Sequence, residues 1–172
     1  MINYDELSKE DAELYQFLLE SDWIEREYPL DGELEAAKKF LAIRYISVDD
    51  IREVAAAVCR GASLRDCFGM DVRVGKYKPP LGGPSIPHEL RLILEKVNVG
   101  YRCGLACGQR AWMTHHSFEN LHPFMDGNGR TGRLLWLYIM KQDVGEWARA
   151  MDLGFLHSFY YQTLEGRKGG WV

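Results

Sequence analysis

Twelve consecutive residues at positions 122–133, HPFMDGNGRTGR, carry side chains that suit chemistry better than a hydrophobic core. Glycines let a ligand approach the main chain, and successive N–H groups at the start of a helix form a site for an anion. Each arginine can hold phosphate oxygens with two N–H groups. The stretch is therefore interpreted as a polyphosphate cradle, with the asparagine lending an amide. Its binding residues are Gly127, Asn128, Gly129, Arg130 and Arg133.

Three further residues of this stretch have separate expected roles. Asp126 directly precedes the cradle and would repel phosphates unless a cation lay between them, so it is the expected ligand of Mg²⁺ or Mn²⁺. His122, whose ordinary pKa is near 6.5, can accept a proton from a hydroxyl group at neutral pH. Phe124 lies between polar neighbours and is expected to point inward as the anchor of the loop.

The plainer interpretations of these residues explain less. Asp126 with Gly127 could simply start a turn, but a turn does not account for Arg130 and Arg133. The arginines could form a solvated helix face, yet they open a helix whose continuation is apolar, and the positive end of the helix dipole disfavours cations there. A bound anion would remove that conflict.

The bulk properties limit the class of protein. A chain of 172 residues is large enough to form a single domain with its own core. Its net charge of -4 gives no general attraction for nucleic acid or an anionic membrane. The N-terminal residues lack the pattern of a signal peptide, and no apolar run reaches the roughly 18 residues of a membrane span. A cytoplasmic location is expected, with no nucleic acid or membrane partner.

The elements that position the stretch read as helices. Apolar spacing predicts helices over 5–24 and 32–46, and Ser47 with Asp50 predicts a capping box for a helix that stops at Gly61. Further helices are predicted from Pro87, and from about residue 105 to the position before Pro123. The run 134–140 is apolar on every side and predicts a buried central helix. A last helix is expected over about 154–166.

One segment of the chain departs from the helical pattern. Residues 71–87, DVRVGKYKPPLGGPSIP, alternate briefly and then become too rich in glycine and proline for a helix. They predict a short strand or hairpin at the surface. The four cysteines are interpreted as free thiols, because nothing indicates secretion; they are Cys59, Cys67, Cys103 and Cys107.

The twelve residues resemble the signature of the Fic family, H-x-F-x-[D/E]-G-N-G-R-x-x-R, and every specified position is met. The resemblance implies a mostly α-helical Fic fold, a bundle around a buried central helix with a small β-hairpin flap. It further implies a single Fic domain over 1–172, with N-terminal helices over 1–60, the flap at about 70–86, the motif at 122–133 and the last helix at about 154–166.

The resemblance also implies a reaction, the transfer of AMP from ATP to a Tyr, Ser or Thr hydroxyl of a target protein. In that scheme His122 deprotonates the hydroxyl, and Asp126 holds Mg²⁺ between the α- and β-phosphates. The main-chain amides of 127–129 and Asn128 hold the phosphates, Arg130 supports them, and Arg133 pairs with the γ-phosphate. The flap residues Arg73, Val74 and Gly75 would pair with an extended target segment. Gly129 distinguishes the motif from Doc-type relatives, which have lysine there and phosphorylate instead.

The resemblance also raises the question of restraint. Many Fic proteins carry, or receive from a partner, an inhibitory helix of the form [S/T]-x-x-x-[A/P]-E-[G/N], whose glutamate pairs with the second arginine and blocks the γ-phosphate. No complete copy is found; Glu165-Gly166 follows Leu164 in place of a small residue or proline, and Glu119-Asn120 lies in the helix before the motif. A separate antitoxin-like inhibitor of a toxin-like enzyme, or no restraint, is therefore expected.

Alternative functions remain open from the sequence. The cradle could serve transfer of another group, such as UMP or phosphocholine, because the base pocket lies outside the motif. The chain could also be a non-catalytic module that binds a nucleotide or a partner, although both the base and the metal ligand are present. His115 and His116 could join His122 in a zinc site, but their spacing makes this awkward, and packing or loop support is preferred.

Overall fold

The computed structural model describes residues 6–99 and 108–144, and within them the chain forms six helices and no strand. A mostly helical architecture is thereby confirmed. In chain order the helices are α1 (Lys9–Glu25), α2 (Glu33–Ala42), α3 (Val48–Val58), α4 (Ser85–Asn98), α5 (Gln109–Leu121) and α6 (Asn128–Val144).

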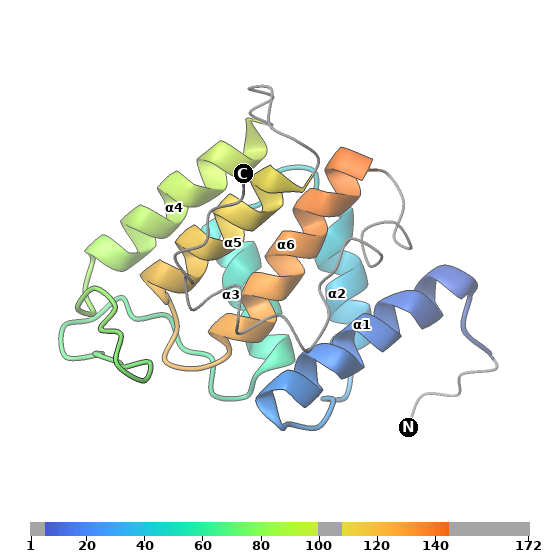
Figure 1. The fold of residues 1–172 in the computed structure, drawn as a ribbon, viewed down its shortest axis with the longest axis horizontal. Coiled ribbons are helices and arrows are strands. Elements are labelled where there is room, and N and C mark those ends of the chain that lie inside the picture. Colours follow the sequence, from blue (N-terminus) through green and yellow to red (C-terminus); the bar gives the residue numbers. More distant parts are fainter. Residues whose placement is uncertain (1–5, 100–107, 145–172) are drawn as a thin grey trace.

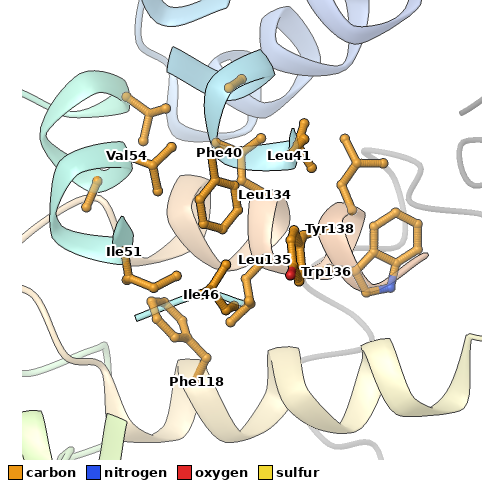
Figure 2. Close-up of a cluster of buried hydrophobic side chains, with 14 of the residues drawn as sticks. Phe40, Leu41, Ile46, Ile51, Val54, Phe118, Leu134, Leu135, Trp136 and Tyr138 are labelled. Carbon is orange, nitrogen blue, oxygen red and sulfur yellow. The ribbon is translucent and has the colours of Figure 1, made fainter. Parts of the chain in front are cut away.

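Helix α6 is the centre of the bundle, as its apolar sequence predicts. It contacts α5, α3, α1 and α2, and it lies in the middle of the ribbon in Figure 1. Figure 2 shows Leu134, Leu135 and Tyr138 of α6 among side chains from α2, α3 and α5, which include Phe40, Ile51 and Phe118. Because α6 is enclosed by other helices, the motif at its start is attached to a helix that is fixed in the hydrophobic core.

Short polar signals set the ends of the helices next to the site. The Ser47 hydroxyl accepts a hydrogen bond from the Asp50 N–H, and the Asp50 carboxylate accepts one from the Ser47 N–H, so the predicted capping box of α3 is confirmed. Helix α5 ends at Leu121, and His122 adopts the left-handed conformation, with φ of 49°. The helix therefore ends before Pro123, as predicted.

The predicted flap takes a simpler form than a β-hairpin. Val74 and Tyr77 exchange two backbone hydrogen bonds, of 3.0 and 2.9 Å, around a tight turn at Gly75, and no longer ladder forms. The β-hairpin is thus not confirmed among the described residues. Pro79 and Pro80 follow after Lys78, and since neither can donate a backbone hydrogen bond, pairing stops after one bridge.

The structure also tests the predictions for the start of α4 and for the cysteines. Helix α4 begins at Ser85, two residues before the predicted start. Cys59 and Cys67 are free thiols, as predicted, whereas Cys103, Cys107 and the expected last helix at about 154–166 lie outside the described residues. Within the part of the chain that the structure describes, no helix combines the length and the apolar character needed to cross a membrane.

The central position of α6 predicts a strong dependence of stability on its inner face. Leu135 is 0% exposed, so Leu135→Ala should lower the free energy of unfolding by about 2–5 kcal/mol through lost contacts and a residual cavity. The same substitution at Leu81, which is 73% exposed, should change it by about 0.5 kcal/mol or less. Urea denaturation followed by circular dichroism measures both, and equal losses would contradict the central place of α6.

Candidate active site

A cavity of about 410 Å³ lies at the start of α6. Four segments line it: the end of α1 with the residues after it, the flap turn, the loop between α5 and α6, and the first turn of α6. The structure thus brings together all but two of the predicted site residues, Phe124 and Arg133. The lining residues are Glu25, Glu27, Arg73, Val74, Gly75, His122, Met125, Asp126, Gly127, Asn128, Gly129 and Arg130.

The first turn of α6 presents main-chain N–H groups at this cavity. The Thr131 N–H donates to the Gly127 carbonyl at 3.0 Å, which closes the first turn and leaves the N–H groups of 128–130 without helical partners. Gly127 has φ of +78°, and a Cβ there would lie 2.6 Å from the Cβ of Cys59. Both the backbone angle and the contact require glycine, and an anion-binding helix start is the result.

The side chain of Asn128 holds the loop from within. Its amide oxygen accepts from the Phe124 N–H at 2.9 Å, and its amide nitrogen donates to the Phe124 carbonyl at 2.8 Å. Phe124 is buried, with its ring 6.4 Å from that of Phe118 in α5. Since the Asn128 amide is used within the protein, the group that it offers to a ligand is its main-chain N–H.

A buried arginine outside the motif joins the loop to the base of the flap. The Arg65 N–H donates to the Pro123 carbonyl at 2.9 Å, and its guanidinium donates to the carbonyls of His122 at 2.6 Å and Met70 at 2.8 Å, and to that of Pro80. No local pattern marks Arg65, because each of these bonds depends on the tertiary fold. It fixes the backbone of the residue that is expected to act as the base.

His122 reaches the cavity from the end of α5. Its N–H donates to the Phe118 carbonyl at 2.8 Å, which closes the helix, and its side chain is half-buried. Burial lowers the pKa of His122, and the positive charge of Arg65 lowers it further. The imidazole is therefore neutral at pH 7, the state in which it can accept a proton.

Arg133 is not open to the cavity, because α1 covers it. Its Nη2 lies 2.8 Å from Oε1 of Glu25, and its Nε donates to the Ser21 hydroxyl at 2.8 Å. The Glu25 carboxylate also lies directly over Gly129, where an added Cβ would collide with Oε1. A carboxylate of the chain thus lies above the first turn of α6 and is paired with Arg133.

The contact of Glu25 with Arg133 is not among the sequence predictions. The motif given above puts its hydroxyl residue five positions before the glutamate, whereas Ser21 stands four positions before Glu25. Arg26 stands where glycine or asparagine is expected, yet it adopts the left-handed conformation that those residues favour, with φ of 60°. A search for a serine one helical turn before a glutamate at the end of α1 would have found the pair.

Asp126 is the one motif carboxylate in the cavity lining. Its Oδ1 accepts from the Gly127 N–H at 2.6 Å. No group of three or more His, Cys, Asp or Glu side chains that could hold a metal occurs among the described residues, which argues against the zinc alternative. His115 is buried, and burial lowers its pKa to about 3. A carboxylate next to a helix start suits Mg²⁺, which can take its other ligands from phosphate and water.

Comparisons with known proteins agree with this geometry. A family model described as the Fic/DOC family matches residues 40–140, more than half of the chain. The chain is 33% identical over 98 residues to protein adenylyltransferase fic-1 of Caenorhabditis elegans, and equally to that of Caenorhabditis briggsae, covering 55% of this chain and 19% of each relative. Protein adenylyltransferase Fic of Drosophila willistoni is 26% identical over 113 residues, 22% of its length. The chain thus spans about a fifth of these relatives.

The position of Arg65 predicts that its charge lowers the pKa of His122. Arg65→Met removes the positive charge beside His122 and should raise the pKa of His122 toward 6.5, although burial keeps it below that value. Proton NMR titration of the histidine ring signals measures the shift, with His122→Ala to identify the signal. Arg65→Lys retains the charge and should leave the pKa low. A folded Arg65→Met protein with an unchanged His122 pKa would contradict this assignment.

Proposed function

The chain belongs to the Fic/DOC family, and on that premise we propose that it transfers AMP from ATP to a hydroxyl group of a target protein. The observation that carries the proposal is the cavity, which gathers a neutral histidine, a carboxylate and an anion-binding helix start. The relatives named protein adenylyltransferase support the same reaction. The modified residue would be Tyr, Ser or Thr.

In the proposed reaction His122 is the general base. The target hydroxyl oxygen forms a bond to the α-phosphorus, the bond from that phosphorus to the oxygen bridging to the β-phosphate breaks, and pyrophosphate leaves. His122 takes the proton of the hydroxyl. The pKa of His122 is below the ordinary value of about 6.5, so the imidazole is mostly unprotonated at neutral pH. The rate should therefore fall on the acidic side at a lower pH than it would for a free histidine.

The start of α6 would bind the phosphates. Residues 128–130 line the cavity, and their N–H groups and the guanidinium of Arg130 would hold phosphate oxygens. Asp126 would hold Mg²⁺, which neutralises phosphate charge when it is bound. Gly129 supports AMP transfer over phosphorylation on the family's own distinction between glycine and lysine at that position.

The flap turn would receive the target. Arg73, Val74 and Gly75 line the cavity, and the exposed edge of the turn could pair with an extended segment of the target protein. The Tyr77 hydroxyl donates to the Asn120 carbonyl at 2.7 Å, which ties the turn to α5, the helix directly before His122. A target held by the turn would therefore keep a fixed distance from the base.

We further infer that α1 restrains the enzyme. The Arg133 guanidinium is paired with Glu25 and bonded to Ser21, so the γ-phosphate of ATP could not engage it in this arrangement. The restraint would lie within the chain itself, and a separate antitoxin-like protein would act in addition to it. This proposal is supported by the position of the Glu25 carboxylate over Gly129.

The function is tested by transfer of label from α-labelled ATP, in the presence of Mg²⁺, to proteins of a cell lysate. We expect labelled protein bands with the Glu25→Ala chain and none when His122→Ala is added. Parallel reactions with labelled UTP and CDP-choline identify a different transferred group. Measured ATP binding with no labelled product, unchanged by His122→Ala, would contradict the proposal and favour a binding module.

The restraint predicts that loss of Glu25 increases activity. Glu25→Ala should raise the rate of AMP transfer at low ATP concentration about 10–100-fold, which corresponds to the roughly 1.5–3 kcal/mol of a charge-assisted contact between Arg133 and phosphate. Glu20→Ala, on the same helix and outside the cavity lining, serves as the control and should leave the rate unchanged. Equal rates for the Glu25→Ala and unaltered chains would contradict the restraint.

A further inference from the structure

A second carboxylate of α1, that of Asp22, faces the other arginine of the motif. Oδ1 of Asp22 lies 3.7 Å from Nη1 of Arg130, and the two side chains are 1% and 7% exposed. We propose that Asp22 is a positioning residue, which holds Arg130 at the phosphate site while AMP is transferred. Helix α1 would then have two roles: Asp22 would position Arg130 for the nucleotide, and Glu25 would occlude Arg133. This inference rests on the proposed function.

The two carboxylates of α1 differ in their freedom to move. The side chain of Glu25 is 30% exposed and reaches the cavity, so it can turn into solvent when a nucleotide arrives. Asp22 lies almost one helical turn earlier and is buried, and moving it away would leave a charged guanidinium without a counter-ion. The contact of Asp22 with Arg130 therefore persists when the contact of Glu25 with Arg133 is broken.

Arg130 has donor capacity that the protein does not use. It lines the cavity, and its buried Nε has no hydrogen-bond partner among the described residues. The contact at 3.7 Å is an ion pair longer than a hydrogen bond, so it attracts the guanidinium without using up its N–H groups. A long side chain held in this way loses less freedom when it binds a phosphate than an unheld one.

Asp22 is the main counter-ion of Arg130, because the neighbouring carboxyl group of Glu33 is mostly neutral. Glu33, the first residue of α2, is buried beside Asp22 and accepts the Leu30 N–H at 3.1 Å. Burial raises the pKa of Glu33 to about 8, and the negative charge of Asp22 contributes to the rise. Glu33 is therefore mostly neutral at pH 7. Burial also raises the pKa of Asp22, but the positive charges of Arg130 and Arg133 and a hydrogen bond with Glu33 oppose this rise. Glu25 of α1 is paired with Arg133 instead.

The test uses the full chain with Glu25→Ala, so that the block is absent. Asp22→Asn removes the charge with little change of shape, and we expect the KM for ATP to rise about tenfold or more while kcat changes less. The Kd of Mg²⁺–ATP, from calorimetry, should rise in parallel. Asp11→Asn is the matched control, because Asp11 also lies on α1 but pairs with Lys38 at 3.1 Å, away from the cavity; it should leave KM unchanged.

A double-mutant cycle separates positioning from a general effect on the fold. With Arg130→Gln already present, Asp22→Asn should cause no further loss, because the guanidinium that it positions is gone. An equal loss in both backgrounds, or an unchanged KM, would overturn the inference while AMP transfer by Glu25→Ala keeps the proposed function intact. Failure of Glu25→Ala to transfer AMP at all would overturn both.

A charge-retaining substitution covers the case in which Asp22→Asn does not fold. Asp22→Glu keeps the negative charge but moves the carboxylate by one methylene group, so it should raise KM for ATP with a native circular dichroism spectrum. An unchanged KM for a folded Asp22→Glu protein would count against positioning. Thermal melting of each variant, compared with Asp11→Asn, shows that the differences in KM are measured on folded protein.

Discussion

Two arginines lie at the start of α6, where the helix dipole disfavours positive charge. The arrangement of the site depends on which negatively charged groups pair with them. Arg130 and Arg133 lie in the first two turns of a buried helix, beside main-chain N–H groups that are themselves partly positive. Such a place requires anions. In this structure the anions are Asp22 and Glu25 of α1, and in the proposed reaction a triphosphate takes the place of the second one.

The geometry of this charged helix start is maintained by ordinary packing and backbone bonding. Leu135 and its neighbours hold α6 in the core, Gly127 lets the chain turn against Cys59, and the Asn128 amide closes the loop on Phe124. Arg65 then binds the loop to the base of the flap through backbone carbonyls. His122, the start of α6 and the flap turn are therefore parts of one connected structure, so a disturbance at Arg65 should reach all three.

Features that depend on neighbours in the chain could be predicted from the sequence. The apolar run of α6, the capping box at Ser47 and the end of α5 before Pro123 all appear as expected. The motif residues gather around one cavity because they are contiguous, with Phe124 and Arg133 outside its lining. Long-range contacts could not be predicted in this way. No local pattern marks Arg65, and Glu25 pairs with Arg133, which lies 108 residues away in the sequence. The spacing of Ser21 and Glu25 also differs from that of the inhibitory motif. The β-hairpin is not confirmed beyond the single bridge between Val74 and Tyr77, because Pro79 and Pro80 cannot donate the backbone hydrogen bonds that would extend it.

The proposed restraint requires that the Glu25 carboxylate pairs with Arg133 where the third phosphate of ATP would otherwise bind. Calorimetric titration of the unaltered chain with Mg²⁺–ATP and Mg²⁺–ADP tests this directly. If Arg133 is held by Glu25, the third phosphate adds nothing, and the two Kd values should agree within about threefold. A Kd for ATP that is about one tenth of the Kd for ADP, or lower, would show that Arg133 is already available and would contradict the restraint by Glu25.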